Sequence, residues 1–433
     1  MMPLRRLLGV SLAAITLGIV SVAAVPRAVP AHDRGVNGSC RHGDRGRLLD
    51  VDRVASHPTA AAARAYFDSW IEFYQDLYHF PNELGVDIDF GFDTYKVTYC
   101  TIDARLASQR RAAPTVATGN VSVPRRSGPM SVVAHVHGTS ASYYDTPSNP
   151  NVAGELEPRG ESFEGPPGSA VFAGAGFVFV APDYPGFGDS TVPRHRYFSA
   201  RAEATSAADL LTASKDVLRR LKAERTGELF TFGFSQGGHS ALALQRLLER
   251  QHVEVTATAT VGGVYDVERW FLSMLEDEIT VTLPLYVSYL LLAYDDMYDV
   301  YRRPSDVFRQ PYAATVPGLF DMQHYWDDIL AGLPPTSREL LRPSYFDAVR
   351  TSPADPMRVR LRQNAVDRWR PEAPIRIYHS PDDEEVPYDD ALVSVDRLRR
   401  RGGDITFERV SGDHVNSWVQ ALPRAAAYFA SLE

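Results

Sequence analysis

The residues whose types and spacing point most clearly to a chemical reaction lie at 233–237, where the sequence is Gly-Phe-Ser-Gln-Gly. In a G-x-S-x-G motif of this kind, a nucleophilic serine occupies a sharp turn between a strand and a helix. The surroundings fit, because the apolar residues 229–232 precede the motif and an amphipathic helix is predicted to begin near Gly237. Glycines leave room for the turn, and the start of the helix favours developing negative charge. We therefore predict that Ser235 is a nucleophile.

A serine hydroxyl needs a general base at neutral pH, usually a histidine that a carboxylate orients. Where the serine lies in a strand–turn–helix motif of this kind, the carboxylate and then the histidine follow it in chain order. The last apolar segment, residues 405–410, is followed by Ser-Gly-Asp-His at 411–414. His414 thus comes just after the final predicted strand, where the base belongs. We predict that His414 is the base.

The base needs a carboxylate that orients it, and this carboxylate should follow the strand predicted at residues 375–378. Four acidic residues compete in the turn after that strand: Asp382, Asp383, Glu384 and Glu385. Their position in the sequence does not decide which of these four carboxylates orients the histidine. Asp413 is a less favourable alternative, because it is the direct neighbour of the histidine that it would have to orient.

Two backbone amides should stabilise the oxyanion of the tetrahedral intermediate. One is the amide of Gln236, which follows the nucleophile, and the other should come from a loop after an early strand. Residues 132–136 are apolar and lead into His-Gly-Thr at 137–139, so we predict the amide of Thr139 as the second donor. His135, His137 and His239 match no zinc-binding spacing, and we expect packing or hydrogen bonding for them.

The elements around these residues alternate between strand and helix. Short apolar segments at 132–136, 177–181, 229–234, 255–261, 375–378 and 405–410 are typical of buried strands. Helical periodicity at 207–221 and 241–248 falls between some of them, which indicates a mainly parallel sheet flanked by helices. Alternation at Tyr95, Val97 and Tyr99, and again at Val121 and Val123, predicts two antiparallel strands.

The alternation stops between residues 265 and 370, a segment rich in Trp, Tyr and Phe. We predict a mostly helical cap there, the alternative being a second domain unrelated to the site. Its most apolar part, residues 279–293, contains Pro284 and is too short to span a bilayer, so a buried helix is expected. The predicted organisation is a signal peptide (1–31), an N-terminal extension (32–92), a two-part core (93–264 and 371–433) and the cap (265–370).

These motifs resemble those of the α/β-hydrolase superfamily, and more narrowly of its secretory lipases and esterases. The shared features are His-Gly-Thr at 137–139 followed by Pro-Ser at 147–148, Asp-Tyr-Pro-Gly-Phe-Gly at 183–188 and Gly-Phe-Ser-Gln-Gly-Gly at 233–238. In the superfamily the acid often stands three residues before a Val-Pro pair, which selects Asp383 ahead of Val386 and Pro387. The base often ends a Gly-x-His, as His414 does. The resemblance implies an α/β-hydrolase fold over residues 93–433.

The N-terminus has the layout of a secretory signal, with Arg5 and Arg6 before an apolar stretch at 7–20. Cleavage is expected after Ala24 or after Ala31, and the alternative is a retained anchor helix. Export fits the cysteine content, since the chain has only Cys40 and Cys100. We predict a disulfide between them, against the alternative of two separate buried thiols.

The sequence thus predicts a secreted serine hydrolase, extracellular or periplasmic, that cleaves small-molecule or lipid esters and needs no cofactor. A formal charge of −9 argues against a nucleic-acid partner. The aromatic cap favours hydrophobic esters and is compatible with transient contact with a lipid surface. The rivals are a serine peptidase, in which Glu276, Asp277 and Glu278 would bind an amine, an acyltransferase, and a non-catalytic binding protein. Acyl length and oligomeric state are not determined by the sequence.

Overall fold

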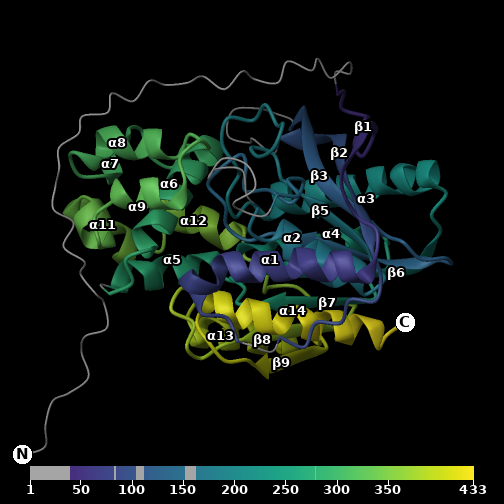
Figure 1. The fold of residues 1–433 in the computed structure, drawn as a ribbon. Helices are drawn as coiled ribbons and strands as arrows, with labels where there is room; N and C mark the ends of the chain where they lie inside the picture. Colours follow the sequence, from purple (N-terminus) through teal and green to yellow (C-terminus); the bar gives the residue numbers. More distant parts are fainter. Residues whose placement is uncertain (1–39, 82–83, 104–111, 152–161, 278) are drawn as a thin grey trace, which may run out of the picture. The chain divides into compact units, whose positions relative to one another are not determined.

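The computed structural model describes residues 40–81, 84–103, 112–151, 162–277 and 279–433. They form a nine-stranded sheet in the order β1-β2-β3-β5-β4-β6-β7-β8-β9 (Figure 1). The signal peptide predicted at 1–31 lies outside the described residues. None of the helices within the described ranges is long and apolar enough to cross a membrane.

Six neighbouring strands of the sheet are parallel, as the apolar segments predicted. These are β5 (Val178–Pro182), β4 (Met130–Val136), β6 (Arg225–Phe234), β7 (Ala257–Val261), β8 (Ile375–His379) and β9 (Ile405–Arg409). Three antiparallel strands extend the sheet at one edge: β1 (Leu48–His57), β2 (Phe92–Asp103) and β3 (Ala113–Pro124). The prediction of two antiparallel strands is confirmed by β2 and β3. The edge strand β1 was not predicted, because only one of its ten residues is buried and its sequence lacks a clear alternation.

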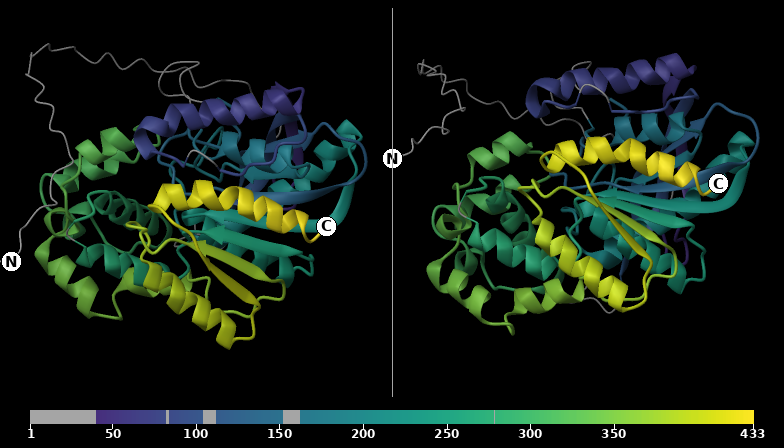
Figure 2. Two further views of the ribbon diagram at one scale, coloured as in Figure 1. Left: turned by 60° about the horizontal axis from the view of Figure 1, so that its bottom comes forward. Right: turned by 90° about the horizontal axis from the view of Figure 1, so that it is seen from below.

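Helices cover both faces of the sheet (Figure 2). Apolar residues of α3 (Ala200–Leu221), α4 (Gln236–Arg250) and α13 (Tyr388–Arg400) pack against one face. The other face packs against α1 (Ala60–Tyr78), η1 (Ser169–Ala173) and α14 (His414–Ala430), with α2 (Gly165–Gly168) beside η1. Alternate residues of one strand enter opposite layers: Val132 and Ala134 face one, Val133 the other. Burial on both faces explains why β4 and β5 are almost entirely apolar.

In the part of the chain that the structure describes, eight helices follow β7 and precede β8 in sequence, on the side of the sheet where the green ribbons gather in Figure 1. They are α5 (Val267–Glu276), α6 (Leu283–Tyr298), α7 (Pro304–Val307), α8 (Tyr312–Leu319), α9 (Trp326–Ala331), α10 (Ser337–Leu340), α11 (Pro343–Thr351) and α12 (Pro356–Gln363). We call them the helical insertion. The buried helix predicted from residue 279 begins only at Leu283, because Pro284 in the first turn fits a helix start. Ile279 and Val281 are 88% and 59% exposed, so the expected burial is wrong for these two.

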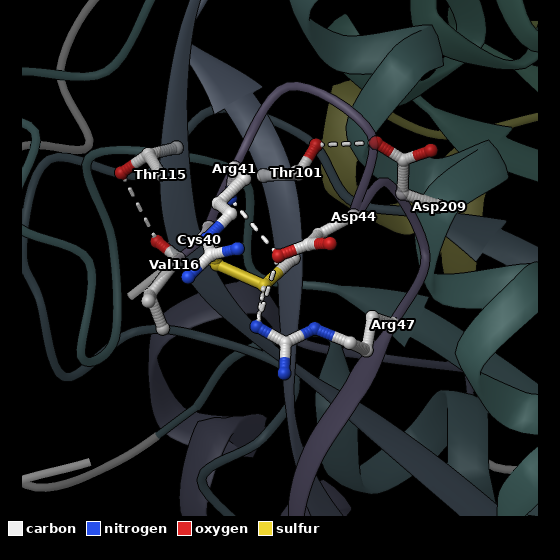
Figure 3. The surroundings of a disulfide bond; sticks show 9 residues. Cys40, Arg41, Asp44, Arg47, Thr101, Thr115, Val116 and Asp209 are labelled. Atoms are coloured by element: carbon white, nitrogen blue, oxygen red, sulfur yellow. Dashed lines mark hydrogen bonds and ion pairs between the residues drawn. A yellow bond between two sulfur atoms is a disulfide. The ribbon is translucent and has the colours of Figure 1, made fainter. Parts of the chain in front are cut away.

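A disulfide joins Cys40 to Cys100 on β2, as predicted (Figure 3). It fastens the segment before β1 to the antiparallel edge of the sheet. An ion pair between Arg45 and Asp209 of α3, 3.0 Å long, holds the same segment against the helix layer.

Candidate active site

Ser235 lies in a tight turn between β6 and α4. Its backbone has φ 56° and ψ −119°, a conformation that is strained for a residue with a Cβ. Two hydrogen bonds hold the turn, one from Ser235 N–H to the carbonyl of Val261 and one from Gly238 N–H to the carbonyl of Ser235, both 2.9 Å. A Cβ at Gly233 would lie 2.0 Å from the carbonyl oxygen of Gly237, so the motif's first glycine is required sterically.

The turns after β8 and β9 bring a carboxylate and an imidazole together. Nδ1 of His414 lies 2.8 Å from Oδ2 of Asp383. The other oxygen of Asp383 accepts hydrogen bonds from two backbone amides of its own turn, at 2.8 and 3.0 Å. Asp413 instead caps α14, where its carboxylate accepts from the amide of Asn416 at 2.8 Å. The carboxylate in contact with the histidine is therefore Asp383, not Asp413.

The electrostatics of this pair favour a charged imidazole. Burial by itself would raise the pKa of Asp383, but the charge and hydrogen bond of His414 lower this pKa overall. Burial would lower the pKa of His414, but Asp383, Glu385 and Glu384 raise it to about 9. An imidazole that is stabilised in its charged form suits a base that must hold a proton during a reaction.

Residues next to the serine turn lie close to the imidazole of His414. The ring of Phe234 lies 4.6 Å from that of His414, centroid to centroid. A Cβ at Gly262, the residue after Val261, would lie 3.1 Å from Cε1 of His414. Nε2 of His414 is buried and has no hydrogen-bond partner among the described residues, and no hydrogen bond there joins it to Ser235. The Asp–His pair is thus beside the serine turn, and a complete Ser–His–Asp relay stays a prediction.

The loop after β4 runs directly against the serine turn. A Cβ at Gly237 would lie 2.0 Å from the carbonyl oxygen of Val136, the last residue of β4. A Cβ at Gly138 would lie 3.4 Å from the Cβ of Ser235. Side chains at both positions would force the loop and the helix apart. The glycines therefore allow the loop to pass next to Ser235.

The two predicted oxyanion donors belong to the two segments that meet here, Thr139 to the loop after β4 and Gln236 to the start of α4. The amide of Gln236 is the first of α4, and the first amides of a helix have no acceptor within the helix. Thr139 is fixed through its side chain, because Oγ1 lies 2.8 Å from the hydroxyl of Tyr197. This arrangement is compatible with an oxyanion site formed by Thr139 and Gln236, which stays a prediction.

A buried carboxyl group that the sequence did not indicate supports the same loop. The amide of Gly138 donates to Oε1 of Glu164 at 2.6 Å, and Oε2 lies 3.1 Å from Nε2 of His135. Burial raises the pKa of Glu164 to about 8, so the carboxyl is mostly uncharged at neutral pH. No motif or periodicity marks this residue. Its role in holding the loop depends on contacts between segments far apart in the chain.

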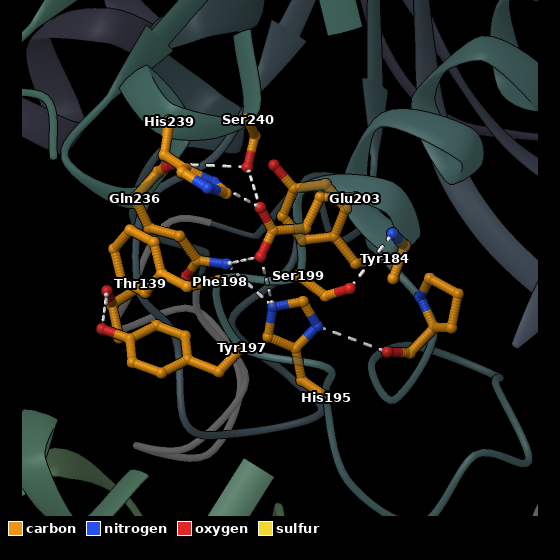
Figure 4. A network of polar contacts seen from close by, with 12 residues as sticks. Thr139, Tyr184, His195, Tyr197, Phe198, Ser199, Glu203, Gln236, His239 and Ser240 are labelled. Carbon is orange, nitrogen blue, oxygen red and sulfur yellow. Dashed lines mark hydrogen bonds and ion pairs between the residues drawn. The ribbon is translucent and has the colours of Figure 1, made fainter. Parts of the chain in front are cut away.

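A second buried carboxylate, Glu203, anchors the first turn of α4 (Figure 4). Its Oε1 accepts from the side-chain amide of Gln236 at 2.9 Å, and its Oε2 accepts from Ser240 at 2.5 Å. His239 Nδ1 lies 3.1 Å and His195 Nε2 3.6 Å from the same carboxylate. Burial would raise the pKa of Glu203, but its contacts with these two histidines lower it to about 2. The anion thus fixes Gln236.

Glu203 could have been found from the sequence. It precedes Ala207, Leu210 and Ser214 at helical spacing, so a carboxylate occupies the face of α3 that is otherwise apolar and small. A charge on such a face needs buried partners.

The side chains of His239 and His137 have structural contacts. His239 Nε2 lies 2.8 Å from the carbonyl of Asn364, and His137 Nδ1 lies 2.8 Å from the carbonyl of Gly138. Within the described ranges, no group of three or more His, Cys, Asp or Glu side chains could hold a metal ion.

The acids considered as an amine site are also engaged. Glu276 pairs with Arg350 at 3.2 Å, and Asp277 accepts from the amides of Ile279 and Thr280. Glu278 lies outside the described residues.

Comparisons with known proteins agree with this fold. The sequence profile of the alpha/beta hydrolase family matches residues 133–427. The rice cell wall degrading esterase LipA from Xanthomonas oryzae is 25% identical, with a TM-score of 0.72 over 90% of this chain and 96% of that one. A putative hydrolase from Legionella pneumophila is 22% identical, with a TM-score of 0.77 over 89% of this chain and 98% of that one.

Lipase A from Candida antarctica is more distant, at 16% identity and a TM-score of 0.61 over 93% of this chain and 88% of that one. No curated protein sequence matches the chain. The profile match spans more than half of the sequence and includes the serine turn, the acidic turn and the histidine. The chain therefore belongs to the α/β-hydrolase family.

Proposed function

We propose that this protein is a secreted serine hydrolase that cleaves carboxylic esters. The observation that carries the proposal is the 2.8 Å contact between His414 and Asp383, next to the strained turn that presents Ser235. The named esterase and lipase of similar fold support an ester substrate over other hydrolase chemistries. The disulfide supports an oxidising compartment, as export would provide.

In the proposed reaction, the Oγ of Ser235 attacks the ester carbonyl carbon while Nε2 of His414 takes the hydroxyl proton. The amides of Thr139 and Gln236 stabilise the resulting oxyanion. His414 then protonates the leaving alcohol, which departs and leaves an acyl-enzyme. The same histidine takes a proton from water while the water oxygen bonds to the acyl carbon. The bond from this carbon to Oγ then breaks, the carboxylic acid leaves, and Oγ takes the proton back from His414. Asp383 holds the imidazole in the correct tautomer throughout.

The test is hydrolysis of para-nitrophenyl esters of increasing acyl length by the wild type and by Ser235→Ala. We expect Ser235→Ala to lose at least about 10³-fold in kcat, and a fluorophosphonate probe to label the wild type but not this variant. Ser411→Ala, at an exposed serine, is the matched control. Activity of Ser235→Ala near the wild-type level would refute the proposal, and a wild type inert to esters and probe would favour a binding protein.

The peptidase alternative receives less support, because Glu276 and Asp277 already have partners within the insertion. An acyltransferase differs only in the acceptor that competes with water. Adding short alcohols to the assay separates the two, since a transferase would form new esters in preference to the free acid.

A further inference from the structure

Glu385 is next to the candidate base but has no part in the proposed triad. Its Oε2 lies 3.7 Å from Nε2 of His414, the ring nitrogen that should exchange a proton with the serine. Asp383 already occupies the other ring nitrogen. The site therefore holds one carboxylate more than ester hydrolysis requires.

Two residues of the helical insertion hold Glu385 in this position. The hydroxyl of Tyr286 on α6 donates to Oε2 at 2.5 Å, and the indole N–H of Trp270 on α5 donates to the backbone carbonyl at 2.8 Å. Contacts to both side chain and backbone keep the carboxyl group aimed at the reaction centre.

This carboxylate lacks a permanent counter-charge. Among the residues that the structure describes, the only ion-pair partner of Glu385 is His414, which is charged only when protonated. A histidine that is ready to act as a base is neutral, and Glu385 then faces no cation. A mostly buried carboxylate without a counter-charge is unfavourable. Its side chain is 18% exposed, so a group on an incoming molecule can reach it.

The surroundings suit a positive charge. Burial raises the pKa of Tyr78, and the charges of Glu385, Asp145 and Asp413 raise it further, so several acids act on one region beside the site. The ring of Tyr286 has Trp270 and Trp326 at centroid distances of 5.5 and 5.8 Å. Tyr286 and Trp270 meet Glu385 through their O–H and N–H groups, so their rings surround the carboxylate with apolar area. In such surroundings a carboxylate attracts a substituted ammonium group more strongly than in water, and a net charge of −9 attracts cations as well.

We propose that Glu385 forms a cation subsite beside Ser235, and that the preferred esters carry a substituted ammonium group close to the ester bond. This inference rests on the proposed ester hydrolysis and adds the substrate class. The ammonium group could be on the alcohol or on the acyl side of the ester. The shared chemistry is a cation within a few bonds of the carbonyl carbon.

Two matched pairs of esters test the subsite. In the first, choline butyrate is compared with the neutral ester in which a tert-butyl group replaces trimethylammonium, which places the charge on the alcohol side. In the second, the para-nitrophenyl ester of trimethylammoniobutyric acid is compared with its tert-butyl analogue, which places the charge on the acyl side. Each pair has nearly the same shape, so the ratio of kcat/KM values reports the charge.

We expect the wild type to prefer the cationic ester of one pair by about tenfold or more. Glu385→Gln should bring that ratio close to one. The ratio is compared at the same position on the pH profile of each enzyme, because the substitution also removes a carboxylate that raises the pKa of His414. Asp382→Asn, at an exposed acid of the same turn, should keep the wild-type ratio.

The subsite is refuted if the wild type cleaves the neutral esters yet shows no cationic preference in either pair, or if Glu385→Gln leaves the preference intact. A failure of the proposed function looks different. In that case none of the four esters is cleaved and the fluorophosphonate probe does not label Ser235, which would refute the subsite as well.

Discussion

Asp383 and His414 follow adjacent parallel strands, β8 and β9, and their side chains meet at 2.8 Å. The contact is possible because both strands end at the same edge of the sheet, so residues 31 positions apart in the chain become neighbours. Asp413 is adjacent to His414 in sequence, but its carboxylate caps α14.

Asp383→Asn should therefore lower kcat by about 10³- to 10⁴-fold, because an amide can neither fix the tautomer nor stabilise the imidazolium. Ester hydrolysis at saturating substrate measures the effect. The control is Asp413→Asn, which keeps an oxygen for the helix cap and should retain kcat near the wild-type value. A larger loss of kcat in Asp413→Asn than in Asp383→Asn would show that the assignment of Asp383 as the orienting acid is wrong.

The activity should rise with pH and reach half its maximum near pH 9, because the neighbouring carboxylates raise the pKa of His414 to about 9. The reason is that a protonated imidazole cannot accept the serine proton, so a higher pKa extends the inactive range to higher pH. Glu385→Gln removes one of these carboxylates and should move the midpoint of the kcat/KM profile to lower pH. An unchanged midpoint in Glu385→Gln, with the same midpoint in Asp382→Asn, would contradict this prediction.

Glu164→Ala should lower kcat by about 10- to 100-fold, because the amide of Gly138 loses its acceptor and the predicted oxyanion loop loses its support. Glu164→Gln should keep most of the activity at pH 7, since an amide resembles the uncharged carboxyl. Measuring kcat and KM separately, with fluorophosphonate labelling to count intact sites, distinguishes this effect from unfolding. Equal losses in the two variants would exclude the positioning role.

Glu203 should stabilise the fold in a pH-dependent way. Its pKa in the folded protein is lowered from an ordinary 4.5 to about 2, so its stabilisation is present above pH 4.5 and is lost as pH falls toward 2. Glu203→Gln should cost about 2–3 kcal/mol in unfolding free energy at neutral pH, and less at pH 3. Urea unfolding at the two pH values measures this difference, with Glu254→Gln at an exposed site as control. A loss independent of pH would disprove a charge-based contribution.

The disulfide should contribute about 4 kcal/mol, because it closes a loop with a sequence separation of 60 residues in the unfolded chain. Replacing both cysteines by serine, or adding a reductant, should lower the melting temperature. Ester hydrolysis at low temperature should persist, since the bridge lies at the antiparallel edge of the sheet. An unchanged melting temperature of the wild type in the presence of the reductant would contradict the prediction.

The sequence by itself determined the parallel strands, the serine turn and its two glycines, since each depends on local patterns: continuous apolar segments, and residue types that a sharp turn requires. It also narrowed the acid to one short turn. The edge strand β1 was not predicted, because a strand whose side chains are mostly exposed shows no clear pattern of apolar residues.

Position in the sequence left four carboxylates for His414 and the family resemblance selected Asp383, but only the tertiary structure shows the contact itself and the partners of the remaining acids. Glu164, Glu203 and Glu385 owe their properties to contacts between segments that are distant in the chain, which bury each carboxyl group and select its partners. A pKa of about 8 for Glu164 and about 2 for Glu203 cannot be inferred from residue type, because burial and hydrogen bonding act in opposite directions on the same side chain.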